Sequence, residues 1–174
     1  MTSSLAARVY EIAHLTGTFT LRSGQTSSEY FDKYRFEADP ALLRDIASAM
    51  APLVPSHVDA LAGLEMGGIP IATALSLETG IPARFVRKEA KTYGTCQLAE
   101  GGDIDGLRLL VVEDVVTTGG QVLLSTKDLR DRGAIVDTVL CAIDRRPEGV
   151  DPFAAEGLEL RALFTMQELL AAGA

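Results

Sequence analysis

The sequence predicts an α/β domain with a mostly parallel β-sheet and helices on its faces. Short apolar runs alternate with helical patterns through the middle of the chain, the order expected of strand–helix–strand units. The clearest run, Leu107–Val112, is apolar after Arg108, as expected of a central parallel strand buried on both faces. A length of 174 residues suits one core, and we expect residues 1–174 to form a single domain.

The N-terminal part of the chain predicts a helix followed by extended segments. Ser3 or Ser4 can cap the helix, and apolar residues recur along one of its faces until Gly17, where we expect it to end. Residues 19–36 read as short extended pieces around the polar turn 23–28.

The rest of the chain alternates between helices and strands. Asp39-Pro40 has the form of a cap followed by proline at the first helical position, and the helix continues at its buried spacing to Leu53. Further helices are expected at 70–78 and 120–132, and the capping box Thr165–Glu168 opens a last short one. Strands are expected at 59–64, 83–88, 107–112, 135–143 and 158–164.

The charge of the chain excludes some partners. Its formal net charge is −8 and its pI is about 4.7. Such a field repels the phosphates of nucleic acids and of anionic lipids, so we expect neither nucleic acid nor a membrane as a partner. An anionic substrate must instead be attracted by a local basic cluster.

Cysteine usage and the absence of export signals predict the cellular compartment. Cys96 and Cys141 lie far apart and lack metal-ligand spacing, and two free thiols suit a reducing environment. The first residues lack the basic and apolar segments of a signal peptide, and no apolar run could cross a bilayer. We therefore expect a cytoplasmic protein.

The most informative segment, Glu113–Gln121, follows the clearest apolar run, where ligands of open α/β sheets bind. Two carboxylates come first, and a hydroxyl- and glycine-rich turn then opens a helix. Free amides at a helix start favour a phosphate, and carboxylates accept hydrogen bonds from sugar hydroxyls. The alternative is a capped turn with two solvated acids, but the complete order of strand, acid pair, Thr-Thr-Gly-Gly and helix favours a ribose-phosphate site.

This segment resembles the phosphoribosyl pyrophosphate motif of the type I phosphoribosyltransferases. The resemblance implies a parallel sheet flanked by helices, with a hood from residues 1–40 and 150–174 over the active site. It implies that Glu113 and Asp114 contact the ribose hydroxyls and that Mg²⁺ is the cofactor. The ion would be held mainly by the donor, and Asp114, a catalytic residue, is its expected protein contact. The donor site would also contain Val115, Val116, Thr117, Thr118, Gly119, Gly120 and Gln121, the last five around the 5′-phosphate.

The segment Leu21–Asp32 is similar to an N-terminal pattern of the orotate branch of this family. A Ser/Gly turn with a cation and two aromatic residues could bind a planar anion, although such a segment alone is more often a plain turn. The resemblance implies that Tyr30, Phe31 and Thr117 contact orotate. It also assigns Arg22 to the donor, in a place where many relatives have lysine.

The densest cationic cluster contains Arg87, Lys88 and Lys91. By itself such a cluster is usually a solvated face, but here it enters a long glycine-containing loop with the composition of a closing lid. Its Arg-Lys-Glu-Ala-Lys sequence matches the catalytic loop of the orotate branch residue for residue. The resemblance implies that these three catalytic cations bind the pyrophosphate of the donor, some of them across the interface of a homodimer. Tyr93 replaces a histidine of many relatives and receives no role.

Two further segments extend the resemblance. Arg145 follows Asp144 at the end of an apolar run and matches the arginine that binds the orotate carboxylate, a pairing that can be bidentate. The alternative is an ordinary surface pair between these two neighbours. The segment Gly63–Pro70 is similar to the pyrophosphate-side turn of the family, and Gly67 replaces a lysine of some relatives, so backbone amides alone would serve there.

Together these resemblances imply a transferase that joins orotate N1 to the ribose C1 of phosphoribosyl pyrophosphate in pyrimidine biosynthesis. A purine phosphoribosyltransferase is the nearest alternative, but purine enzymes often carry an acid where Thr117 stands. A regulator that senses the same donor and binds nucleic acid would need a basic face, which a net charge of −8 opposes. No Gly-x-Gly-x-x-Gly follows a strand, which disfavours a dinucleotide-binding domain.

Overall fold

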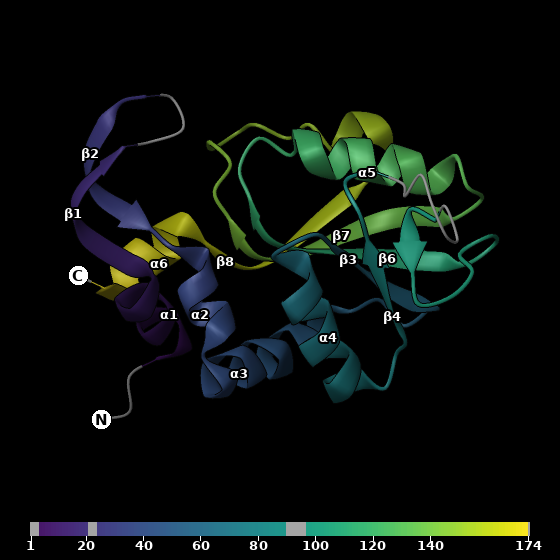
Figure 1. Cartoon of the computed structure of the whole chain (residues 1–174), viewed down its shortest axis with the longest axis horizontal. Helices are drawn as coiled ribbons and strands as arrows, with labels where there is room; N and C mark the ends of the chain where they lie inside the picture. The colour runs from purple at the N-terminus through teal and green to yellow at the C-terminus, as the bar shows by residue number, and fades with distance from the viewer. Residues whose placement is uncertain (1–3, 21–23, 90–96, 174) are drawn as a thin grey trace.

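A computed structural model describes residues 4–20, 24–89 and 97–173 (Figure 1). Its helices are α1 Leu5–Ala13, α2 Lys33–Ala38, α3 Pro40–Met50, α4 Gly68–Thr79, α5 Gly120–Arg130 and α6 Met166–Gly173, with 3-10 turns η1 Ala51–Leu53 and η2 Ala154–Glu156. Its strands are β1 His14–Thr20, β2 Thr26–Phe31, β3 Ala60–Leu64, β4 Ala83–Val86, β5 Ala99–Glu100, β6 Arg108–Val116, β7 Ile135–Asp144 and β8 Glu159–Thr165.

A six-stranded sheet in the order β5-β4-β3-β6-β7-β8 forms the centre of the molecule. All neighbouring strands run parallel except β4 and β5, which are antiparallel. Helix α5 covers one face, and α3 and α4 cover the other (Figure 1). Successive residues of β6 enter opposite cores, Leu109 and Val111 on the α5 side and Leu110 and Val112 on the other. The predicted mostly parallel α/β fold is confirmed.

The remaining elements, α1, β1, β2, α2 and α6, lie at one end of the sheet, and we call them the hood (Figure 1). Strands β1 and β2 form a separate antiparallel pair. The two chain ends meet here, because α1 packs against α6 so closely that a Cβ on Gly173 would lie 2.0 Å from Tyr10 Cδ1. Strand β8 belongs to the main sheet, so α6 is the C-terminal part of the hood.

Several helix boundaries follow from their caps. Asp39 Oδ1 accepts hydrogen bonds from the amides of Ala41 and Leu42, which confirms the predicted start of α3. At α6, the Thr165 amide donates to Glu168 Oε2 and the Glu168 amide donates to Thr165 Oγ1, as the capping box predicts.

Four sequence predictions about elements are wrong. The first helix ends at Ala13, and Gly17 lies within β1, where pairing with β2 makes the chain extended. Residues 33–36, predicted as extended, belong to α2 because Asp32 caps this helix and Phe36 gains a buried position. Strand β6 continues to Val116 because it stays paired with β7, and the short strand β5 was not predicted.

The next observations concern membrane-spanning helices and the two cysteines. None of the described helices combines the length and apolar character that crossing a membrane requires. Burial raises the pKa of the Cys141 thiol, and this cysteine lies free within β7. Cys96 lies outside the described residues.

Candidate active site

The predicted acid pair lies inside β6, near its carboxyl end. Successive side chains of a strand point to opposite faces. Asp114 has no exposed area, whereas Glu113 is partly exposed. Glu113 Oε1 accepts the Asp114 amide at 3.0 Å, and Asp114 Oδ1 accepts the Val115 amide at 2.6 Å. The two carboxyls therefore offer different surfaces to a ligand, although they are neighbours in the sequence.

Helix α2 brings a cation and a third acid to this pair. Lys33 Nζ lies 2.6 Å from Asp114 Oδ2, and Glu37, four residues further along the helix, is also buried. Residues four apart share a helix face, so both side chains point from α2 toward β6. The sequence prediction missed them because it placed this stretch in extended segments. The four-residue spacing after the capping Asp32 is the signal that would have found them.

The charges of this acid cluster are unequal. Burial, together with the neighbouring Asp114 carboxylate, raises the pKa of both Glu37 and Glu113 to about 9. Burial also acts to raise the pKa of Asp114, but contacts with Glu113, Lys33 and Glu37 outweigh it and lower that pKa. Burial acts to lower the pKa of Lys33, and its contact with Asp114 raises it above 10.5. Near neutral pH the cluster thus holds one ion pair, Lys33–Asp114, and two protonated glutamates.

The turn between β3 and α4 packs directly against Asp114. A Cβ on Gly67 would lie 1.7 Å from Asp114 Oδ2, and one on Gly68 would lie 2.3 Å from the Val112 carbonyl oxygen. Only glycine fits at these positions, so the backbone of the turn packs directly against β6, and both glycines are buried. The Glu65–Met66 peptide of this turn is cis.

The hydroxyl- and glycine-rich turn leads from β6 into α5. Thr117, Thr118 and Gln121 are exposed, whereas Val116 is buried and serves the core. Gly119 has a φ of 78° and caps α5 without a side-chain hydrogen bond. The first amides of the helix are therefore free to bind an anion, with the favourable end of the helix dipole behind them. The remaining predicted members, Val115 and Gly120, are partly buried and exposed, respectively.

Part of the predicted lid lies beside this edge. Arg87 Nε lies 3.3 Å from Glu100 Oε1. The Lys88 side chain is exposed, and the Lys88 backbone amide donates a hydrogen bond to Glu65 Oε1 at 2.6 Å. The strand that enters the lid is thereby linked to the β3–α4 turn. Lys91 and Tyr93, as well as Arg22, lie outside the described residues.

Three of the four predicted orotate residues, Tyr30, Phe31 and Arg145, meet in one pocket of about 380 Å³, whereas Thr117 is not among its lining residues. Within the described part of the chain, the Arg145 guanidinium has no hydrogen bond or ion pair, and only its backbone amide is used, donating to the Val116 carbonyl. The pocket also contains residues that the sequence prediction missed, because distant segments supply them: Tyr10, His14, Ser27, Glu29, Met166 and Leu170.

The neighbouring arginine has a different environment. Arg146 Nη2 lies 2.9 Å from Asp144 Oδ2, its Nη1 lies 2.9 Å from Asp151 Oδ1, and the guanidinium stands over the Phe153 ring. Asp144 therefore pairs with Arg146 and not with Arg145, so the alternative of an Asp144–Arg145 surface pair is wrong.

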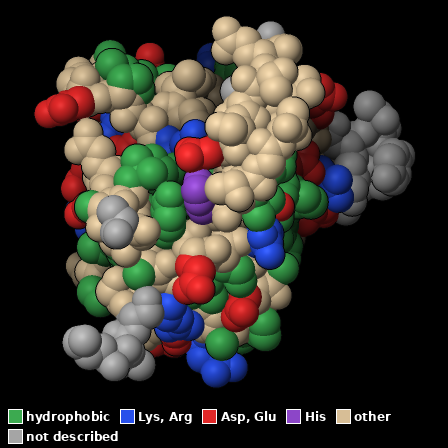
Figure 2. Space-filling model, turned by 90° about the vertical axis from the view of Figure 1, so that its left-hand side faces the viewer, with side chains coloured by type: hydrophobic (Ala, Val, Ile, Leu, Met, Phe, Trp, Pro, Cys, Tyr) green, Lys and Arg blue, Asp and Glu red, His purple; other side chains and the backbone are tan. Residues whose placement is uncertain are grey.

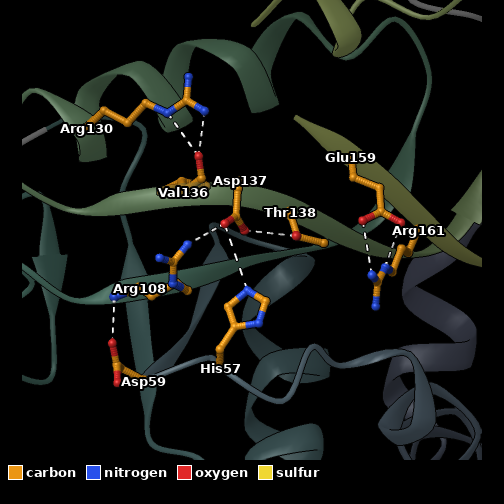
Figure 3. Close-up of polar contacts among 9 residues, drawn as sticks. All are labelled: His57, Asp59, Arg108, Arg130, Val136, Asp137, Thr138, Glu159 and Arg161. Carbon is orange, nitrogen blue, oxygen red and sulfur yellow. Dashed lines mark hydrogen bonds and ion pairs between the residues drawn. The ribbon is translucent and has the colours of Figure 1, made fainter. Parts of the chain in front are cut away.

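Polar groups near the amino ends of the strands, opposite the candidate site, are paired with one another (Figure 3). Arg108 donates its amide to Asp59 and its guanidinium to Asp137, and His57 lies 3.9 Å from the same Asp137 oxygen. Arg161 binds Glu159 through two nitrogens. These contacts join strand starts and account for His57 as a structural residue.

The described residues contain no group of three or more His, Cys, Asp or Glu side chains that could hold a metal ion. The Asp114 carboxylate faces Lys33 and has no exposed area. The chemistry of this set does not fit a magnesium ion held by the protein alone.

Known proteins share this arrangement. The family described as "Phosphoribosyl transferase domain" matches residues 34–155. Orotate phosphoribosyltransferase of a Nocardioides species is 56% identical over 170 residues, which cover 98% of this chain and 95% of that protein. The solved orotate phosphoribosyltransferase of Mycobacterium tuberculosis H37Rv has a TM-score of 0.85 at 33% identity, with 95% of this chain and 96% of that chain covered. Its complex with 5-phospho-α-D-ribosyl 1-diphosphate has a TM-score of 0.79 at 31% identity, with 95% and 96% covered. The parallel sheet and the sequence similarity to these relatives over nearly the whole chain show that the chain belongs to the orotate phosphoribosyltransferase family.

Proposed function

We propose that this chain transfers the 5-phosphoribosyl group of phosphoribosyl pyrophosphate to orotate, giving orotidine 5′-monophosphate and pyrophosphate in the de novo synthesis of UMP. The observation that carries the proposal is Arg145, which lines one pocket with Tyr30 and Phe31 and whose guanidinium is unpaired among the residues that the structure describes. Orotate is a planar ring with one carboxylate, and a guanidinium with aromatic neighbours suits such a molecule.

The donor would lie along the carboxyl edge of the sheet. The amides at the start of α5 and the hydroxyls of Thr117 and Thr118 are suited to the 5′-phosphate. Glu113 is the acid that we expect to accept hydrogen bonds from the ribose hydroxyls, because part of it is exposed. Asp114 has no exposed area, so it would support the ribose site from beneath the surface. It would contact the ribose directly only if Lys33 moved aside.

The proposed chemistry forms one bond and breaks one. Orotate N1 bonds to the ribose C1 while the C1–oxygen bond to pyrophosphate breaks, so positive charge develops on the sugar. Arg87, Lys88 and Lys91 would stabilise the negative charge that develops on pyrophosphate. For Lys91 this role rests on the sequence resemblance, as does the assignment of Arg22 to the donor. Closing of the lid would also exclude water, which would otherwise hydrolyse the donor.

The cofactor, assembly and compartment are parts of the same proposal. Mg²⁺ would be bound through the donor's oxygens, and the complex of the Mycobacterium tuberculosis relative with this donor supports the choice of donor. The active form would be a homodimer whose lid loop is shared between subunits. We place the reaction in the cytoplasm on the composition of the sequence.

The hood end of the molecule has a mixed surface. Figure 2 shows acidic, basic and hydrophobic side chains interspersed on this face. The net charge of −8 remains the argument for small-molecule substrates rather than nucleic acid.

A competition between acceptors tests the proposal. The chain is incubated with Mg²⁺ and phosphoribosyl pyrophosphate together with orotate, adenine, hypoxanthine or uracil, and release of pyrophosphate is measured. We expect turnover with orotate alone. Turnover with a purine and not with orotate would overturn the assignment, and Arg145→Ala serves as a matched control for the acceptor site.

A further inference from the structure

The β3–α4 turn carries no cation of its own, because its backbone lies directly against a carboxylate. A Cβ on Gly67 would lie 1.7 Å from Asp114 Oδ2, so no longer side chain fits there. The cation that faces this oxygen comes from another element, since Lys33 Nζ in α2 lies 2.6 Å from it. The turn, the carboxylate and the ammonium thus form one contact that joins the hood to the sheet.

This contact has an electrostatic consequence for the turn. An anion bound at this turn would sit close to the Asp114 carboxylate, which is buried and forms an ion pair with Lys33. A buried carboxylate without a partner would repel that anion strongly, because charges interact more strongly in the interior than in water. The Lys33 ammonium neutralises the charge of Asp114, which the turn itself does not do because it carries no cation.

We propose that Lys33 is a positioning residue of the pyrophosphate subsite, which acts by neutralising Asp114 beneath the Gly67–Gly68 turn. This inference rests on the proposed function, since it assumes that the turn receives the pyrophosphate end of the donor. Lys33 acts through Asp114 and does not touch the ligand. Without Lys33, the turn keeps its amides but faces an uncompensated negative charge.

Binding of inorganic pyrophosphate with Mg²⁺, measured by calorimetry, tests the inference. Lys33→Met should weaken binding by about ten- to a hundredfold, the usual range for losing a charge-assisted contact. Lys33→Arg keeps the charge and should restore most of the affinity. The matched control is Arg35→Met, which removes one exposed positive charge from the same helix and should leave pyrophosphate affinity unchanged.

A double variant separates this role from a purely structural one and from direct contact. If Lys33 acts through Asp114, Lys33→Met should cost little once Asp114→Asn has removed the charge, so the double variant should bind pyrophosphate as well as Asp114→Asn does. This comparison also applies if Lys33→Met alone fails to fold, because the double variant buries no unpaired charge.

Three outcomes would overturn the inference. One is a folded Lys33→Met protein with wild-type pyrophosphate affinity, and another is an equal loss in Lys33→Arg. The third is a further loss when Lys33→Met is added to Asp114→Asn, which would mean that Lys33 contacts the ligand directly. If the unmodified chain binds neither pyrophosphate nor phosphoribosyl pyrophosphate, the proposed function itself fails.

Discussion

At the scale of single residues, two adjacent arginines illustrate how the structure divides labour between similar side chains. Arg146 is held by Asp144, Asp151 and the Phe153 ring, so its charge is used within the protein. Arg145 lines the pocket, and its guanidinium has no partner among the described residues. A cation left unpaired at a pocket wall is available for a ligand carboxylate.

Arg145→Ala should therefore reduce orotate affinity and leave the fold stable. The loss of a charge-assisted bidentate contact typically costs about 1.5–3 kcal/mol of binding free energy. Donor affinity should fall much less, because the proposed role of Arg145 is to bind the acceptor. Calorimetry with each substrate measures the two affinities.

The neighbouring variant provides the control. Arg146→Ala should lower the free energy of unfolding, because it leaves Asp144 partly buried without its partner. An equal loss of orotate and donor affinity in Arg145→Ala would show that Arg145 does not mark the acceptor site.

Residue types with an unusual local context were predictable from sequence. The acid pair with its Thr-Thr-Gly-Gly turn, and Arg145 after Asp144, stand out at strand ends, so their roles could be proposed without coordinates. The opposite faces of Glu113 and Asp114 were not predicted, because the strand was expected to end at Val112 and actually continues to Val116. A boundary error of a few residues thus changed the expected exposure of both acids.

At the scale of elements, helix α2 has the largest effect on the site for its length. Its six residues bring Lys33 and Glu37 against the same strand. Sequence reasoning missed α2 because six residues show less than two turns of periodicity, and tertiary packing of Phe36 stabilises it more than local propensity does.

Glu37→Gln should stabilise the protein increasingly as the pH rises. The pKa of Glu37 is raised from 4.5 to about 9 in the folded state. Between these values the folded state keeps a proton that the unfolded state releases, so the wild type loses stability with rising pH, whereas glutamine has no proton to lose. The gain should be at most about 1.4 kcal/mol per pH unit above 4.5.

Urea unfolding near pH 5 and near pH 8 measures this difference. Glu78→Gln, a change at an exposed position of α4, is the control and should show no comparable trend. A Glu37→Gln effect of the same size at both pH values would mean that Glu37 is ionised in the folded protein.

At the scale of the whole molecule, the proposed site combines segments that are far apart in the sequence. The pocket contains residues of α1, β2 and α6 beside Arg145, and its wall could not be deduced from local patterns. The order of strands and helices was predictable because apolar residues recur at different spacings in strands and in helices. The packing of α1 against α6 was not predictable, because the sequence of either helix does not indicate which element it packs against.

Mixing two variants with different defects should restore activity if the lid is shared between subunits. In a dimer of one Lys91→Ala chain and one Arg145→Ala chain, a lid acting across the interface gives one site with both residues intact. After random exchange of subunits, roughly a quarter of all sites should be intact, because half of the dimers are mixed.

Turnover of the mixture is compared with that of each parent after subunit exchange has been verified. Activity no greater than the sum of the parents would show that Lys91 serves its own subunit. The same experiment with Lys88→Ala tests that cation separately.

The meeting of the two chain ends in the hood sets an order of assembly during protein synthesis. Tyr10 leaves the ribosome early, whereas Gly173, which packs tightly against its ring, is translated much later. Met166 and Leu170, two walls of the Arg145 pocket, belong to the same late helix. A nascent chain therefore contains the complete turn proposed to bind phosphate before the last two walls of the Arg145 pocket exist. The proposed donor site is complete first, and the proposed acceptor pocket only when α6 packs against α1.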